Sequence, residues 1–278
     1  MLLAFCAKGA ADPPALPPVS ATSAEPQDAD SKFQQARALL HGEGVEKNPQ
    51  KAFDLMKAAA EQGHAEAMGG VGYFYSIGLV VAKDDRLAAE WFRKGADRGS
   101  AKAQFNLGKI LLAGGAVEGI QWTKKAADQG LSEAGLAYGS ILYFGDHGVA
   151  KDQEKAAPYL KIAADAGDPE AQNFYGTLCE LGLGVPQDSN EARRWLHKAA
   201  LQGFVKAQSN LGASLGPQVE DGETRIEALA WLIIASGQGE VTAEKLLADT
   251  VPGLKSEDLD AAKIRVAELR KTIRLRRP

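Results

Sequence analysis

The chain has 278 residues, a formal net charge of −4 and a hydrophobic content of 45%, much of it alanine. The acidic balance argues against a protein that binds nucleic acid through an overall basic surface. No stretch approaches the roughly 20 consecutive apolar residues that a membrane-spanning helix needs, so no such span is expected.

Residues 1–30 differ in composition from the rest of the chain, because prolines lie there among alanines, serines and acidic residues. The prolines of the central part are Pro13, Pro14, Pro17 and Pro18. Such a composition predicts an extended, disordered tether. The apolar run before it ends in Cys6 and is similar to the end of a bacterial lipoprotein signal, which makes Cys6 a candidate for lipidation. Phe5 and the lack of a preceding basic stretch argue against this, so envelope and cytoplasmic locations both stay open.

Residues 31–240 repeat a frame with a period near 36 residues. All four tryptophans lie eight residues before a glycine: Trp91, Trp122, Trp195 and Trp231. We call the six glycines in this position the frame glycines: Gly63, Gly99, Gly130, Gly167, Gly203 and Gly239, which are 36, 31, 37, 36 and 36 residues apart. A fixed period of this length predicts a solenoid of about six stacked units.

Two helices are expected in each unit. In the second helix, apolar residues at three- and four-residue steps form one stripe, as Ala192, Trp195 and Ala199 show. The frame glycine after it fits the left-handed backbone that often ends a helix. The first helix carries a glycine nine residues after the frame glycine: Gly72, Gly108, Gly139, Gly176 and Gly212. Because a mid-helix glycine costs about 1 kcal/mol relative to alanine, this repetition predicts that two helices approach very closely there.

Short loops join the two helices, and two of them share the pattern Gly-x-Gly-Val, as at residues 42–45 and 182–185. Polar residues near the loop end are expected to cap the second helix: Asn48, Asp84, Asp152 and Asp188. Pro49 suits the first helical position. The third unit lacks five loop residues, which explains its spacing of 31.

At this point the chain resembles the Sel-one-like repeat (SLR) family, a relative of the tetratricopeptide repeat. The matching features are Leu107-Gly108 and Leu211-Gly212, the Gly-x-Gly-Val loops, the alanine and tryptophan of the second helix, and the ending Ala199-Ala200-Leu-Gln-Gly203. The resemblance implies an all-α fold, a right-handed α-solenoid of about six helix-turn-helix repeats. It also implies a scaffold or adaptor, often bacterial, that holds other proteins together.

Residues 241–278 leave the frame. A short helix is expected over 241–249, a break at Pro252-Gly253, and a last helix capped by Ser256. Its apolar face consists of Leu259, Ala262, Val266, Leu269 and Ile273. This pattern predicts a helical C-terminal cap on the solenoid; an amphipathic helix that docks on a partner is the alternative.

No catalytic or metal-binding constellation emerges. The four histidines lie in different units, and the motifs of hydrolases and phosphate-binding loops are missing. We therefore expect no enzyme, no metal site and no cofactor. The tryptophan position invites a ligand-stacking interpretation, but its regular alanine neighbours favour the core. Cys179 is expected to be a small buried apolar residue.

The expected function is to bind a protein or peptide on a concave face lined by the first helices. The candidate contact residues are Tyr73, Asn106, Lys109, Tyr143, Asn173, Thr177 and Glu180. Two alternatives stay open. One is an envelope protein, tethered through Cys6, that regulates cell-wall or secretion machinery. The other is a hydrolase that acts on the cell wall or on β-lactams, a class of enzyme that some SLR proteins resemble. The partner and the oligomeric state are not predicted.

Overall fold

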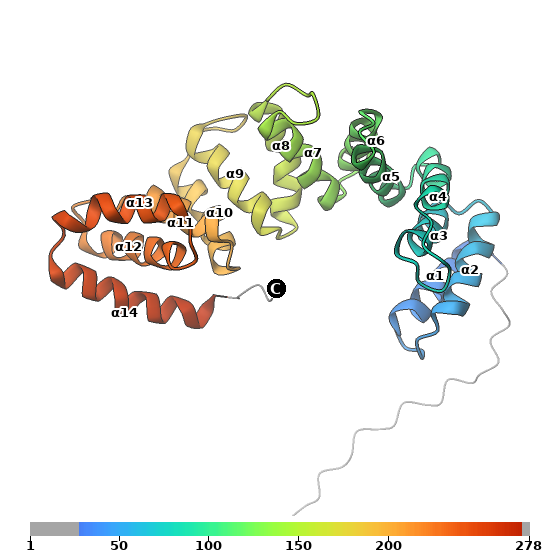
Figure 1. Ribbon diagram of the computed structural model, residues 1–278, viewed down its shortest axis with the longest axis horizontal. Coiled ribbons are helices and arrows are strands. Elements are labelled where there is room, and N and C mark those ends of the chain that lie inside the picture. Colours follow the sequence, from blue (N-terminus) through green and yellow to red (C-terminus); the bar gives the residue numbers. More distant parts are fainter. Residues whose placement is uncertain (1–27, 274–278) are drawn as a thin grey trace, which may run out of the picture.

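The chain forms an arched stack of helix pairs (Figure 1). The computed structural model describes residues 28–273, and in that range it contains fourteen α-helices, one 3₁₀ turn and no strand. The first helices of six units are α1 (Ala29–His41), α3 (Ala65–Ile77), α5 (Ala101–Ala113), α7 (Ser132–Phe144), α9 (Pro169–Leu181) and α11 (Val205–Leu215). The second helices are α2 (Pro49–Glu61), α4 (Asp85–Asp97), α6 (Glu118–Asp128), α8 (Gln153–Asp165), α10 (Ser189–Leu201) and α12 (Gly222–Ser236).

The spacing of the helices indicates toward which side the stack curves. Two pairs of successive first helices approach each other, α3 with α5 and α9 with α11, whereas no two successive second helices of the six units come as close. A stack in which one row of helices is more closely spaced than the other must curve toward the closely spaced row. This confirms the predicted α-solenoid and gives it an inner surface made by the first helices.

Two helices and a turn close the C-terminal end: α13 (Val241–Thr250), the 3₁₀ turn Val251–Gly253 and α14 (Ser256–Thr272). The predicted apolar face of α14 packs on α12, where Val266 and Leu269 join the cluster around Trp231. Arg265 of α14 also pairs with Glu227 of α12. The cap thus covers a second helix whose apolar side would otherwise face water.

The predicted capping residue of the last helix is wrong. Lys255 occupies the N-cap position in an extended conformation, no side chain caps the helix, and Ser256 is its first residue. The preceding 3₁₀ turn sets this register, and Glu257 and Asp258 supply negative charge in the first turn.

The tryptophans belong to the core, as predicted. Trp122, Trp195 and Trp231 expose 9%, 7% and 0% of their surface, and Trp91 is half-buried. In the three buried cases the indole N–H donates to a glutamate one turn earlier, as from Trp195 to Glu191 at 2.6 Å. A buried ring with a satisfied N–H is the arrangement expected of a structural tryptophan.

The mid-helix glycines mark the closest approach of the two helices in each unit. A Cβ at Gly108 would lie 2.5 Å from the Thr123 hydroxyl and 2.9 Å from the Gly119 carbonyl oxygen. Cβ atoms at Gly72, Gly139, Gly176 and Gly212 would likewise lie 2.7–3.0 Å from a side chain of the second helix. The predicted packing reason for these glycines is confirmed.

The predicted helix ends are confirmed as well. All six frame glycines have positive φ angles, between 81° and 97°. The side chains of Asn48, Asp84, Asp152 and Asp188 accept hydrogen bonds from backbone N–H groups of the following helix. In the shortened third unit Val117 takes the N-cap position without a side-chain bond.

Buried glutamines connect successive units. Gln172 of α9 donates to the Ala164 carbonyl oxygen of the preceding unit at 3.2 Å and accepts from Gln202 at 3.0 Å. The same two bonds recur at Gln104 with Gln129 and at Gln208 with Gln238. Units two and four lack the pair and carry Met68 with Arg98, and Gly135 with Ala166, at these positions.

Val80 is held in a strained conformation. Its φ is 73°, in the left-handed region, where the matching loop residues of units one and five are Gly44 and Gly184. A β-branched residue pays roughly 1–2 kcal/mol there, and the Val80 side chain is 38% exposed, so burial offsets little of this cost.

Val80→Gly is therefore expected to raise the free energy of unfolding by about 1 kcal/mol, since the relieved strain exceeds the added entropy of the unfolded chain. Urea denaturation of both forms measures this. Val81→Gly is the matched control. Val81 packs on the core cluster of units one and two, around Phe53 and Phe74, and its φ is not positive, so this change should lower the free energy of unfolding. A loss of stability in Val80→Gly would contradict the strain.

Candidate functional site

One side of the first helices repeats with the units and is mostly exposed, although Phe174 on it is buried. Residues 3, 7, 10 and 14 positions after a frame glycine fall on one side of the helix because of its 3.6-residue period. We call this set the inner stripe: Glu66, Gly70, Tyr73 and Ile77 on α3; Lys102, Asn106, Lys109 and Ala113 on α5; Glu133, Ala137, Ser140 and Phe144 on α7; Glu170, Phe174, Thr177 and Leu181 on α9; Lys206, Asn210 and Ala213 on α11.

Four of the seven predicted contact residues lie on the inner stripe. Tyr73 is 46% exposed and Lys109 is exposed, while Asn106 and Thr177 are half-buried. The Thr177 hydroxyl donates to the Asn173 carbonyl oxygen at 2.9 Å. These four side chains are placed where a partner could reach them.

The other three, Tyr143, Asn173 and Glu180, contact the next unit. Asn173 is only 3% exposed, and its side-chain oxygen accepts a hydrogen bond from Asn210 at 2.8 Å. Glu180 accepts from the Ser214 hydroxyl at 3.1 Å. The Tyr143 ring stacks at 4.8 Å from Phe174, and burial raises the pKa of its hydroxyl. These residues join units, so we leave them out of the surface proposed below.

Sequence reasoning missed three exposed apolar side chains at the ends of first helices. Ile77, Phe144 and Leu181 are the last residues of α3, α7 and α9 and are 47%, 59% and 56% exposed. Each lies fourteen positions after a frame glycine and directly before the loop glycine. That recurring position was the available signal, because a large apolar residue at a helix end next to a loop glycine has few neighbours to bury it.

Hollows lie between first helices of successive units. One, about 390 Å³ in volume, is lined by Phe105, Lys109, Ser132, Glu133, Leu136, Ala137 and Asp168. Another, about 300 Å³, is lined by Thr177, Glu180, Leu181, Leu196, Asn210, Ala213 and Ser214. The inner surface therefore has depressions of side-chain size that are shared between neighbouring units.

The second helices carry a different pattern, in which a basic side chain lies against the aromatic ring of the next unit. The pairs are Arg93 with Trp122, Lys124 with Tyr159, and Lys161 with Trp195, at 5.6–6.0 Å from the ring centre. His197 takes this place against Trp231, with ring centres 5.8 Å apart. Such contacts strengthen the junctions between units.

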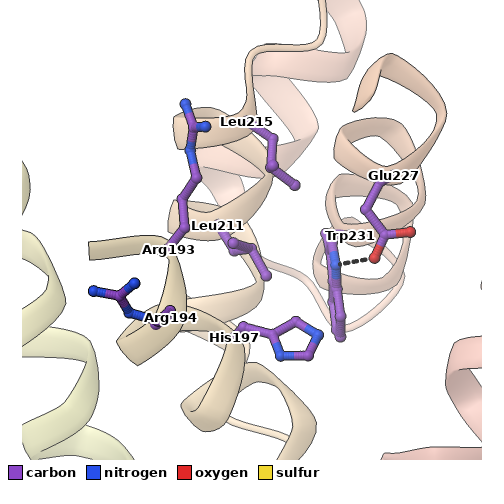
Figure 2. Close-up of a pocket in the computed structure, with 7 residues that line it drawn as sticks. All are labelled: Arg193, Arg194, His197, Leu211, Leu215, Glu227 and Trp231. Atoms are coloured by element: carbon purple, nitrogen blue, oxygen red, sulfur yellow. Dashed lines mark hydrogen bonds between the residues drawn. The ribbon is translucent and has the colours of Figure 1, made fainter. Parts of the chain in front are cut away.

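A pocket opens between α10, α11 and α12 around His197 and Trp231 (Figure 2). Its polar groups bind each other: the Trp231 N–H donates to Glu227, and Arg193 donates to the Ser214 carbonyl oxygen at 2.8 Å. Arg194 pairs with Glu191, and both arginine side chains point away from the Trp231 ring in Figure 2. The pocket is thus a junction between units rather than a set of groups waiting for a ligand.

Reactive groups do not gather anywhere in residues 28–273. No group of three or more histidine, cysteine, aspartate and glutamate side chains there could hold a metal ion. Cys179 is buried, as predicted, and burial raises the pKa of its thiol. Burial also raises the pKa of the adjacent Tyr175 to about 12. Both groups therefore stay neutral near pH 7.

The N-terminal candidate, Cys6, lies outside the described residues. Among the described helices, none is both long enough and apolar enough to cross a bilayer.

Comparison with protein families finds the Sel1 repeat in five consecutive copies, at residues 31–64, 65–100, 101–131, 132–168 and 169–204. These are units one to five. The helices α11 and α12 add a sixth pair with the same glycine contact, between Gly212 and Leu232.

Two solved structures are similar to this chain. A protective antigen of uropathogenic Escherichia coli strains with an SLR fold is 29% identical, with a TM-score of 0.69 over 88% of this chain and 54% of the antigen. A Sel1 repeat protein of Oxalobacter formigenes is 31% identical, with a TM-score of 0.60 over 76% of this chain and 88% of that protein.

Two curated proteins are similar in sequence. Chitin synthase regulatory factor 3 of Schizosaccharomyces pombe is 28% identical over 60% of this chain. An uncharacterised protein of Neisseria meningitidis serogroup B is 29% identical over 78% of this chain. The chain spans only 15% and 44% of the lengths of these two relatives.

Proposed function

Because this chain belongs to the Sel1 repeat family, whose members are generally protein-interaction scaffolds, we propose that it is a scaffold or adaptor that binds a protein or extended peptide on the inner stripe. The observation that carries the proposal is the inner stripe itself. It runs across α3, α5, α7, α9 and α11 and exposes Tyr73, Ile77, Lys109, Phe144 and Leu181.

The rest of the described surface supports this assignment. In the pocket between α10, α11 and α12 the polar groups bind each other. Burial keeps the Tyr175 hydroxyl and the Cys179 thiol neutral. A Sel1 repeat solenoid is typical of non-enzymatic scaffolds, and the proposal accordingly assigns no catalytic residue. The S. pombe relative is named as a regulatory factor, which supports a role in which binding controls another protein.

Charge reversal at Lys109 tests the proposal. Lys109→Glu is expected to change the amount of partner captured from native cells, quantified by mass spectrometry, because Lys109 lines the hollow between α5 and α7. Circular dichroism and thermal melting should stay unchanged, since the side chain is exposed. Lys245→Glu, an exposed charge reversal on α13, is the matched control and should retain capture. Equal capture by both variants and the wild type would contradict binding at this surface.

A tether through Cys6 is a second proposal, motivated by the short apolar run before that cysteine. It is compatible with a scaffold that acts on cell-wall or secretion machinery. Cell fractionation together with fatty-acid labelling of the wild type and Cys6→Ser tests it. Labelling that persists in Cys6→Ser, or a label-free wild type in the soluble fraction, would rule the tether out.

A further inference from the structure

We propose, building on the scaffold function above, that units four and five bind an extended segment carrying large apolar side chains at one end and lysine or arginine about five residues away. The proposed contacts are Phe144 and Leu181 for the apolar side chains and Glu133 and Glu170 for the basic ones. All four lie on the inner stripe of the adjacent first helices α7 and α9.

A glutamate and a large apolar residue recur at a fixed spacing on these helices. Glu133 precedes Phe144 by eleven residues, and Glu170 precedes Leu181 by eleven. Eleven residues are close to three full helical turns, so both members of each pair lie on the same side of the helix. The structure therefore places an acidic edge and an apolar edge on one surface, formed by two neighbouring helices.

The other units show that the two positions change together. Unit two repeats the pair as Glu66 and Ile77. Unit three carries Lys102 and Ala113 at these positions, so the apolar side chain is lost where the charge is reversed.

Apart from their place in the first turns of α7 and α9, the two glutamates of units four and five have no charged partner within residues 28–273. Glu133 and Glu170 are exposed and form no ion pair with any residue in the range 28–273. Glu133 accepts only a hydrogen bond from the neighbouring Ser132 hydroxyl, at 3.0 Å. Asp168 caps α9 nearby and adds a third negative charge, while Lys109 is the one cation lining the same hollow. The acidic edge is therefore complementary to a basic side chain.

Phe144, at the apolar edge, rests on the buried ring of Phe174. The Phe144 ring meets Phe174 edge-on at 5.4 Å and Tyr143 at 5.0 Å, yet 59% of Phe144 faces solvent. Leu181 lines the hollow between α9 and α11 together with Thr177 and Ala213. Exposed apolar side chains anchored on buried rings offer a firm surface for a partner's apolar side chain.

The distance between the two edges sets the spacing in the partner. Eleven residues of α-helix span about 16 Å at 1.5 Å per residue. An extended chain advances about 3.3 Å per residue, so it covers that distance in about five residues. Ala137 and Ser140 lie between the edges on α7 and are small, which leaves room for a backbone to lie across them.

The test uses the full-length chain and synthetic fluorescent peptides in a glycine-serine background, measured by fluorescence anisotropy at low salt. The first peptide carries two phenylalanines and two arginines with four residues between the pairs, so that the nearest phenylalanine and arginine are five positions apart. The second has the same composition with the residues alternating, and in the third glutamate replaces arginine. We expect the first peptide to bind at least tenfold more tightly than the other two, with an affinity that falls as salt is added.

Variants locate the binding. Phe144→Ala and Leu181→Ser should each weaken the first peptide about tenfold, as central apolar anchors do. Glu133→Gln with Glu170→Gln should weaken it up to about fivefold and remove most of the salt dependence. Ile264→Ser is the matched control, since Ile264 is 66% exposed on α14, away from this surface. The double glutamine variant keeps the shape of both side chains, so it remains informative if Phe144→Ala loosens the fold.

Equal binding of the three peptides would overturn the inference, as would variants that bind like the wild type. Sedimentation at several concentrations adds a further outcome: if Phe144→Ala dissociates a dimer without changing peptide affinity, the surface serves a second copy of the chain and the inference fails. If no peptide binds while Lys109→Glu still changes native capture, the scaffold function stands and only this partner chemistry is rejected.

Discussion

Trp195→Ala is expected to lower the free energy of unfolding by about 3–5 kcal/mol, as large deletions in a core do. Trp195 is 7% exposed and packs with Ala163, Ala171 and Tyr175 from α8 and α9. Its ring also lies 3.9 Å below the Lys198 ammonium, and its N–H binds Glu191. The substitution therefore removes contacts of units four and five at once.

The loss should be local, because each unit of a solenoid contacts mainly its neighbours. Native-state hydrogen exchange should show faster exchange in units four to six before units one and two respond. Trp91→Ala is the mirror-image control: Trp91 packs against the cluster of units one and two, so its removal should loosen that end. Uniform acceleration along the whole chain in both variants would contradict a linear stack.

Gly108→Ala is expected to destabilise the protein by about 3 kcal/mol, the reverse of what alanine does in an ordinary helix. The added Cβ would lie 2.9 Å from the Gly119 carbonyl oxygen, and a Cβ on Gly119 would in turn lie 2.6 Å from the Gly108 carbonyl oxygen. Backbone atoms face each other on both sides, so only separation of α5 and α6 makes room. That separation would weaken the packing of Leu107 and Trp122 in the same cluster.

A second glycine provides the control for this sign reversal. Gly222 is the first residue of α12, and a Cβ there would meet only the Arg225 side chain, at 3.8 Å. Gly222→Ala should be neutral or stabilising by up to about 1 kcal/mol. Urea denaturation of both variants gives the comparison, and a Gly108→Ala protein as stable as the wild type would show that the helices can move apart freely.

The fold could be predicted from the sequence because the residues that end or cap each helix are also the residues that mark the repeat. A glycine such as Gly130 both ends a helix and marks the repeat, and a residue such as Asp188 both closes a loop and caps the next helix. Each unit repeats the same pattern of glycines, capping residues and large apolar residues. One repeating frame therefore predicts the helix ends, the helix pairs and the buried tryptophans together. The last helix has no such repetition, and there the capping residue Ser256 was predicted wrongly.

The exposed side of the first helices could be predicted only in part. Periodicity separates the exposed side of one helix from its core side, which placed Tyr73 and Lys109 correctly on the surface. It does not show which part of the exposed side faces the next unit, because that depends on the rotation between units. Asn173 and Glu180 fall in that part and bind the next unit instead.

The glutamine pairs determine how this gene could change in length. Every pair links a side chain to an alanine carbonyl at the same place in the preceding unit, Ala96, Ala164 or Ala200. Excision of residues 169–204 by recombination would bring the Gln208 side chain to the carbonyl of Ala164. Gln238 would still donate to the Gln208 side-chain oxygen, so no buried amide would lose its hydrogen bonds. Loss of unit four, residues 132–168, would in the same register bring Gln172 to the carbonyl of Ala127, with Gln202 still bound to Gln172. Whole units could thus be gained or lost along the stack without stranding a buried glutamine, because alanine stands at the acceptor position in units one to five, at residues 60, 96, 127, 164 and 200.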